Sequence, residues 1–277
     1  MPALDAIQQR LAKARHIDRS LNYGRHIIRD FLRRTLEGRD ASSANPLTNP
    51  LIADLGAGHG DDLRIAHNLF PNARLHAIEA MDYHASLLEN QWLASQPDAP
   101  PNLTVHRLDI ERHALPFENE SADAIIANQI LEHTKELFWI LHEAARVLRV
   151  GGAIIVGVPN LASLHNRLLL LMGRQPTSIL LDSAHVRGLT RQGLRRLLAA
   201  AAPGILRIEA SAGSNFYPLP AWAARPAARV MPGLAVSAFF LIRKRAPYAA
   251  EILDYVKISR FETNYRVTAD LQPEPQS

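Results

Sequence analysis

The stretch from Leu51 to Glu79, LIADLGAGHGDDLRIAHNLFPNARLHAIE, constrains the fold more than any other part of the chain. An apolar, strand-like run over 51–53 leads through Asp54 into a glycine-rich turn over 56–60. A helix-like segment follows, and a second strand-like run over 75–78 ends at Glu79. Together these elements form the unit that holds a nucleoside at the carboxyl ends of parallel strands. Glycines let the backbone approach the ligand, and the Glu79 carboxylate is suited to accept hydrogen bonds from ribose hydroxyls.

The spacing of the glycines indicates which nucleoside is bound. A dinucleotide fingerprint would place a glycine at position 61, where this chain has Asp61. The observed pattern, acid-x-G-x-G-x-G, resembles motif I of the class I S-adenosylmethionine-dependent methyltransferases; a tight turn in another α/β protein is the alternative. The resemblance implies S-adenosyl-L-methionine as cofactor, whose cationic sulfonium and amino groups tolerate nearby acids. The cofactor-binding residues that it implies here are Asp54, Gly56, Ala57, Gly58, Gly60, Glu79 and Ala80.

Two later segments extend the resemblance. A third strand over 103–108 ends at Asp109 and Ile110, which the resemblance places beside the adenine amino group and ring. Asp109 as a turn or helix-cap residue is the alternative. The string from Leu115 to His133 resembles the small-molecule (type 11) branch that includes ubiquinone and menaquinone methyltransferases. Following a strand over 124–127, Asn128 and Gln129 are then expected to face the cofactor.

Strands and helices alternate from position 51 to 158, which predicts an α/β fold with a doubly wound parallel sheet. We expect a helix over 136–148 that stops at Gly151-Gly152, then a strand over 153–158. The resemblance implies a Rossmann-like sheet of seven strands whose last two cover 205–210 and 236–242, the final one antiparallel between its neighbours. A helical extension and linker (1–49) precede the methyltransferase domain (50–245), and a tail (246–277) follows. The middle of that tail, 249–261, is expected to form a surface helix or strand.

Two insertions in the domain, 159–189 and 212–235, follow strand ends that should face one cleft. The first begins with a nearly uncharged segment over 161–173, expected to be a short helix, and the second is rich in aromatic residues and proline. We predict that both form a substrate lid. Their apolar character indicates a hydrophobic substrate or contact with a membrane surface; ordinary packing over the sheet is the alternative.

Methylation of an oxygen requires loss of its proton, for which a histidine is the usual group. The candidate catalytic residues are His185, in an H-x-R-x-L-T element, and His133, for which a structural hydrogen bond is the alternative. The H-x-R-x-L-T element resembles one found in enzymes that are encoded with glycan and lipid assembly systems. Some quinone O-methyltransferases place a metal on an E-x-x-x-E-H loop, but here Gln129 replaces the first glutamate and leaves only Glu132 and His133. Because two ligands are too few, we predict no required metal.

Composition excludes several other chemistries. The chain has no cysteine, which rules out disulfides, cysteine-held metal clusters, radical S-adenosylmethionine chemistry and a thiolate nucleophile. Its net charge is +4, and the excess lies between Arg10 and Arg39, a segment that could meet phosphates or lipid headgroups or form a solvated helix face. No signal peptide is visible, and the longest apolar run, 230–242, is too short to span a bilayer.

The sequence therefore predicts an S-adenosylmethionine-dependent methyltransferase that modifies an oxygen of a small-molecule, glycan or lipid-linked acceptor. We expect a cytoplasmic protein with peripheral membrane contact as an option. Nucleic acid is disfavoured because the segment Asn128–Leu131 lacks the N-P-P-Y-like turn of base-amine methyltransferases. Two alternatives remain open: an RNA or protein methyltransferase that uses the basic amino-terminal helices, and a cofactor-binding partner protein without catalysis.

Overall fold

The computed structural model describes residues 18–37, 49–94 and 102–259. Several sequence-based expectations lie outside these ranges. They concern the first part of the amino-terminal extension (1–17), most of the linker (38–48), the proline-rich loop (95–101) and the end of the tail (260–277).

A seven-stranded sheet organises the described residues, with strand order β3-β2-β1-β4-β5-β7-β6. Strands β1 to β5 are parallel, and β7 runs antiparallel between β5 and β6. This arrangement confirms the predicted Rossmann-like fold and the position of the final strand. The strands are β1 (Leu51–Leu55), β2 (Arg74–Glu79), β3 (Leu103–Arg107), β4 (Ala122–Asn128), β5 (Leu148–Pro159), β6 (Leu206–Ser214) and β7 (Ser237–Lys244).

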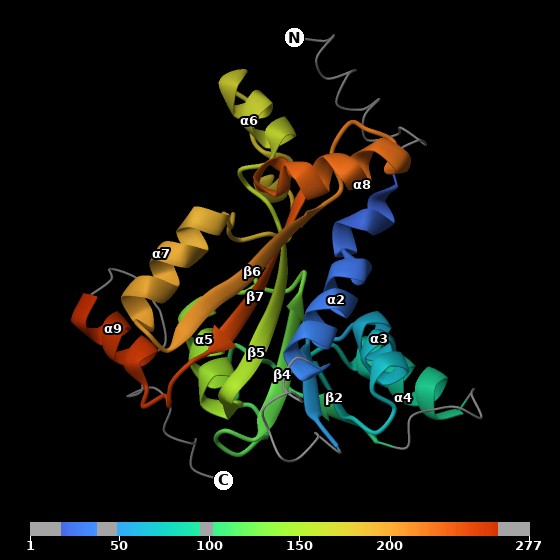
Figure 1. The fold of residues 1–277 in the computed structure, drawn as a ribbon, viewed down its shortest axis with the longest axis vertical. Helices are drawn as coiled ribbons and strands as arrows, with labels where there is room; N and C mark the ends of the chain where they lie inside the picture. The colour runs from blue at the N-terminus through green and yellow to red at the C-terminus, as the bar shows by residue number, and fades with distance from the viewer. Residues whose placement is uncertain (1–17, 38–48, 95–101, 260–277) are drawn as a thin grey trace.

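Helices cover both faces of the sheet (Figure 1). Helices α2, α3 and α4 lie on one face, and α5, α7 and α9 lie on the other. Side chains alternate along each strand, so neighbouring residues of β7 enter different cores: Phe239 packs on the α2/α3 side and Phe240 on the α5/α9 side. The helices are α2 (Arg25–Leu36), α3 (Asp61–Leu69), α4 (Asp82–Ala94), α5 (Leu137–Val147), α7 (Arg191–Ala201) and α9 (Glu251–Ser259).

The region around Gly151 and Gly152 differs from the prediction. Helix α5 ends at Val147, and both glycines lie inside β5 rather than at a helix stop. Leu148 already has extended backbone angles and pairs with Ala122 of β4. A Cβ atom on Gly152 would lie 2.8 Å from the Leu148 side chain, so a close approach requires the glycine. Strand β6 is also longer than predicted and includes residues 212–214, the start of the expected second insertion.

The extension and the tail are both packed onto the domain. Ile28 and Leu32 of α2 are fully buried against the sheet. In α9, Ile252, Leu253 and Val256 are buried and the helix contacts α5 and α7. The tail therefore contributes a helix to the core, where the sequence indicated a surface element.

Helices α6 (Leu164–Leu171) and α8 (Ala221–Val230) project from one end of the sheet, as Figure 1 shows. Both carry exposed apolar side chains, with exposed fractions of 83% for Leu171 and 80% for Trp222. Within the described ranges, none of the helices combines the length and hydrophobicity needed to cross a bilayer.

Candidate active site

The glycine-rich turn connects β1 to α3 at the carboxyl edge of the sheet. The backbone N–H groups of Gly56 and Ala57 donate to the carbonyl of Ile78, at distances of 2.8 and 3.2 Å. Gly56, Gly58 and Gly60 all have positive φ angles, which favours glycine at each position. Above Gly58 the space is open, because a Cβ atom there would meet only the Gly56 carbonyl oxygen, 4.0 Å away. The turn therefore has room for a ligand directly against its backbone.

Glu79 ends β2 beside this turn and is 6% exposed. Its Oε2 accepts a hydrogen bond from the Gly58 N–H at 3.0 Å, and its Oε1 accepts one from the Met81 N–H at 2.9 Å. These bonds fix the carboxylate while each oxygen retains a lone pair. Ala80, the next predicted cofactor residue, is exposed at the same edge.

Two further acids are buried near the turn. Burial, together with the charges of Asp62 and Glu79, raises the pKa of Asp54 well above its usual range. Burial raises the pKa of Asp62 to about 6, although a hydrogen bond from Asn128 opposes this shift. Asp62 Oδ1 has no hydrogen-bond partner. A cationic ligand would stabilise both carboxylates in their ionised form.

Asn128 is the last residue of β4 and Gln129 follows it, as expected, but the two side chains have different surroundings. Asn128 Nδ2 donates to Asp62 Oδ2 at 2.7 Å and to the Tyr23 carbonyl at 3.1 Å, so Asn128 links β4 to α3 and to the segment before α2. Gln129 has a positive φ angle, and its buried Nε2 has no partner.

Asp109 and Ile110 lie in the turn after β3. Asp109 Oδ1 accepts a 2.8 Å hydrogen bond from the Glu111 N–H, and Oδ2 lies 3.4 Å from Nε of Arg112. This is the turn role that the sequence left as an alternative. Ile110 is buried, 9% exposed. Recognition of adenine by these two residues stays a prediction.

A cavity of about 690 Å³ opens beside the ends of three strands. Gln129, Pro159 and Ser237 line it at the carboxyl ends of β4 and β5 and the start of β7. Leu164, Leu168 and Leu169 of α6 form part of its wall, and Tyr217 and Pro218 from the second predicted insertion form another part. Both insertions therefore contribute to one cavity.

Two histidines line the same cavity, His165 and His185. The ring of His165 is held by Ser163 Oγ at 3.1 Å and Thr177 Oγ1 at 2.8 Å, and its burial lowers its pKa to about 4. His165 was not among the predicted site residues; its position in the first insertion was the only signal in the sequence that could have indicated it.

The two predicted catalytic histidines come together, although 52 positions separate them. The rings of His133 and His185 lie 4.7 Å apart between centroids, at an interplanar angle of 75°. His133 Nδ1 donates to the Ala184 carbonyl at 3.2 Å, and His185 Nδ1 donates to the Ser178 carbonyl at 2.9 Å. A carbonyl only accepts, so each neutral ring keeps its Nε2 lone pair. Burial, reinforced by His185, lowers the pKa of His133.

Hydrogen bonds connect residues 184–187 to the loop that follows β4. The Val186 N–H donates to the Glu132 carbonyl at 2.8 Å. The Arg187 guanidinium donates to the carbonyls of Thr134 and Lys135, at 2.9 and 2.6 Å. These bonds give a structural role to the arginine of the H-x-R element. Arg187 anchors residues 184–187 to the loop after β4 and so positions His185.

Comparison with known proteins shows which family of domains this architecture resembles. Residues 53–156 match a family model described as a methyltransferase domain. That match covers less than half of the chain, so it shows a segment that is similar to methyltransferase domains. The chain also resembles, with 33% identity over 126 residues, a protein of Streptomyces fradiae described as "Uncharacterized 37.1 kDa protein in transposon TN4556". That match covers 45% of this chain and 34% of the relative, so it spans about a third of the relative's length.

Solved structures show the same fold. The YcgJ protein from Bacillus subtilis is similar with a TM-score of 0.52 and 18% identity, over 80% of this chain and 99% of that chain. A putative methyltransferase in complex with the Trm112 methyltransferase activator of Haloferax volcanii is similar with a TM-score of 0.50 and 15% identity. That match covers 83% of this chain and 96% of the other.

The geometry fits S-adenosyl-L-methionine, the cofactor that the resemblance of the glycine-rich turn implies. The space over Gly58 accepts a flat or bulky group against the backbone, and Glu79 presents two oxygens suited to ribose hydroxyls. The unpartnered Oδ1 of Asp62 supplies negative charge for a cationic ligand. The cofactor-binding role of each residue stays a prediction.

Glu132 lies beside the two histidines and is only 1% exposed. Both of its carboxylate oxygens lack a hydrogen-bond partner, and burial raises its pKa to about 7. From the sequence, Glu132 was merely one of two retained residues of a metal-binding loop. The buried, unpaired carboxylate and its distance to His185 could only be seen in the tertiary structure.

Proposed function

We propose that this protein is a methyltransferase, which transfers the methyl group of S-adenosyl-L-methionine to an oxygen of a small or lipid-linked acceptor. The apolar part of the acceptor would occupy the cavity between α6 and residues 217–218. The observation that carries this proposal is the position of the cavity, which has leucine side chains along α6 and His185 in its wall.

The arrangement of the strands supports transfer between the two sites. The glycine turn follows β1 and Glu79 ends β2, and the cavity begins at Gln129, just after β4, and at Pro159, the end of β5. Carboxyl ends of parallel strands meet at one edge of a sheet, which is where α/β proteins bind their ligands. The donor and the acceptor are therefore expected side by side.

Methyl transfer from a sulfonium is an in-line displacement, so the protein mainly aligns the reacting atoms and excludes water. The acceptor oxygen must also lose a proton. His185 Nδ1 is engaged by the Ser178 carbonyl, which leaves Nε2 as the basic atom of a ring in the cavity wall. We assign His185 to acceptor activation, and His133 to the support of that ring.

The described basic residues favour a small acceptor over RNA. In α2, Arg25 pairs with Asp61, Arg33 with Glu37, and Arg34 with Glu209. These arginines make contacts within the chain, and the apolar side of α2 packs on the sheet. Pairing with acids of the same chain makes these three arginines less available to RNA phosphates.

Transfer of labelled methyl groups tests the proposal. The protein is incubated with methyl-labelled S-adenosyl-L-methionine and a cell lysate, which is then separated into lipid, small-molecule, glycan, nucleic-acid and protein fractions. We expect label in the lipid or small-molecule fraction, in an alkali-stable ether or an ester, and no steep loss between low and moderate salt. Label in RNA or protein would overturn the acceptor class. Binding of the cofactor without label in any fraction would support a partner protein without catalysis.

A further inference from the structure

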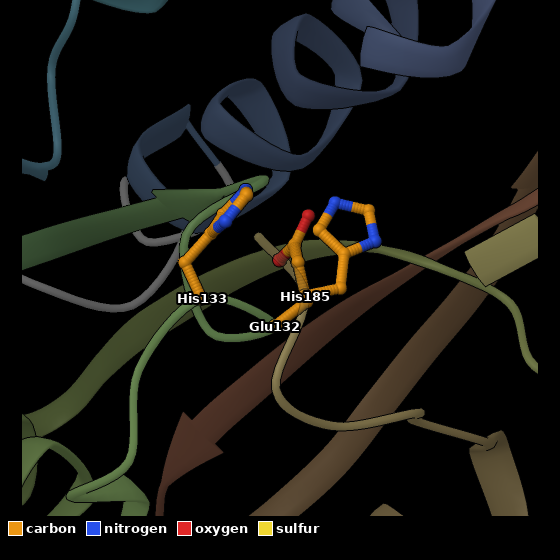
Figure 2. A group of neighbouring side chains, drawn as sticks. All are labelled: Glu132, His133 and His185. Atoms are coloured by element: carbon orange, nitrogen blue, oxygen red, sulfur yellow. The ribbon is translucent and has the colours of Figure 1, made fainter. Parts of the chain in front are cut away.

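From the sequence only Glu132 and His133 were available as ligands, and on that ground we predicted no required metal. The fold brings His185 to them, and the three residues together have the composition of a metal site. Each residue offers one ligand atom, and these atoms lie within 4.8 Å of one another. Figure 2 shows that the three side chains point the same way, with the Glu132 carboxylate near both rings. We propose that these three residues bind a divalent transition-metal ion of the zinc class at the wall of the acceptor cavity.

The hydrogen bonds of the two histidines prepare them as ligands. Nδ1 of His133 donates to the Ala184 carbonyl, and Nδ1 of His185 donates to the Ser178 carbonyl. Metal-binding histidines typically donate their second ring N–H in this way, which fixes the tautomer and raises the basicity of the ligating nitrogen. Both Nε2 atoms therefore carry lone pairs available to an ion.

The buried carboxylate of Glu132 supplies an independent observation. It is 1% exposed, and neither of its oxygens has a hydrogen-bond partner. An isolated carboxylate in such a place is costly unless it is protonated or paired with a cation. A divalent ion between the two imidazoles would provide that partner.

The loops that carry the ligands are held together before any ion binds. The Val186 N–H donates to the Glu132 carbonyl, and Arg187 donates to the carbonyls of Thr134 and Lys135. Ligand atoms around zinc lie about 2.0–2.2 Å from the ion. The ligand atoms, now within 4.8 Å of one another, would therefore draw closer on binding, and His133 is the exposed member of the three.

The donor set decides the class of ion. Two imidazole nitrogens and one carboxylate suit zinc, iron, cobalt or manganese, whereas magnesium and calcium prefer oxygen ligands. Three protein ligands leave a coordination position for water or for an acceptor oxygen. With an ion bound, both Nε2 atoms act as ligands, so the ion takes over acceptor activation from the free His185 ring. It would lower the pKa of a bound hydroxyl, whose proton passes to solvent.

That catalytic role rests on the proposed function, but binding of the ion does not, and it is measured without turnover. The chelator-treated protein is titrated with Zn²⁺ by calorimetry, and with Co²⁺ while its visible ligand-field absorption is recorded. We expect one high-affinity ion per chain. Substitutions E132Q, H133N and H185N should each lower the affinity by about 100-fold or more, because loss of a second-shell partner alone costs roughly 10–100-fold.

H106N is the matched control, because Nε2 of His106 lies 3.0 Å from Nδ1 of His76 without a carboxylate between them. It should retain the high-affinity site. Equal affinity in the wild type, E132Q and H185N would overturn the proposal, as would loss of the site in H106N alone or a wild type that binds no ion. Binding of S-adenosyl-L-homocysteine to every variant shows that the fold is intact and tests the cofactor site separately.

Discussion

Oε2 of Glu79 lies 3.0 Å from the backbone nitrogen of Gly58 and accepts its hydrogen bond. This contact joins the end of β2 to the glycine-rich turn after β1. The group predicted to bind ribose and the backbone predicted to support the adenosyl moiety are thus one connected unit. Substitutions at the two positions test it in different ways.

Substitution Gly58→Val is expected to abolish binding of the cofactor, because the side chain would fill the open space over the turn. Gly204→Val is the matched control, since both glycines have positive φ angles and open surroundings. Backbone strain of about 1–2 kcal/mol is then common to both variants. Calorimetric titration with S-adenosyl-L-homocysteine gives the comparison. An unchanged dissociation constant in Gly58→Val would refute this placement of the ligand.

Substitution Glu79→Ala should weaken binding by about 1–3 kcal/mol, through the loss of charge-assisted hydrogen bonds to ribose. S-adenosyl-L-methionine and S-adenosyl-L-homocysteine should be affected equally, because they share the ribose. The variant also loses the acceptors for the Gly58 and Met81 N–H groups, so thermal unfolding must be measured in parallel. Loss of affinity for only the charged cofactor would place Glu79 near the sulfonium instead.

Asp62 should make stability depend on pH. Its pKa is raised from 3.8 to about 6 in the folded chain. Between pH 3.8 and about pH 6, Asp62 is ionised in the unfolded chain but still protonated in the folded chain. The free energy of unfolding therefore falls as pH rises through this range, and above about pH 6 the whole cost of the buried charge is present. Asp62→Asn should therefore stabilise the ligand-free protein by about 2–3 kcal/mol at pH 7.5 and by much less at pH 4. Urea unfolding at both pH values measures this; an equal effect at both would contradict it.

Substitution Leu168→Glu should impair use of an apolar acceptor. Leu168 lines the cavity and is 50% exposed, so the variant is expected to fold. We expect kcat/KM for the acceptor to fall about tenfold or more, with an unchanged dissociation constant for the cofactor. Leu171→Glu is the control on the same helix, since Leu171 is 83% exposed and does not line the cavity. Similar losses in both variants would point to the outer surface of α6 rather than the cavity.

Substitution His185→Ala should lower turnover by about 100-fold or more and leave the dissociation constant of the cofactor within about twofold. His26→Ala, an exposed position on α2, should change neither. Initial rates and calorimetric titration provide the two measurements. If cofactor affinity is lost with turnover, His185 belongs to the donor site and not to the acceptor site.

Local patterns predicted most of the fold. Strand alternation and the glycine turn are properties of consecutive residues, so β1, β2 and the turn between them were readable from the residues alone. The resemblance added the antiparallel β7. The error at Gly151-Gly152 has a physical cause: a glycine pair serves equally well to stop a helix and to admit a close strand, and only the pairing of Leu148 with Ala122 distinguishes the two.

The candidate site depended on contacts that no local pattern contains. The sequence by itself determined a parallel α/β sheet with a nucleoside turn and an acid at the next strand end, because those features follow from periodicity and from glycine's conformational freedom. Only the tertiary structure decided that His185 lies against His133, that Glu132 is buried beside them without a partner, and that both insertions line one cavity. The burial of a side chain and the distance between residues far apart in the sequence depend on how the whole chain packs. Local sequence patterns therefore do not predict them.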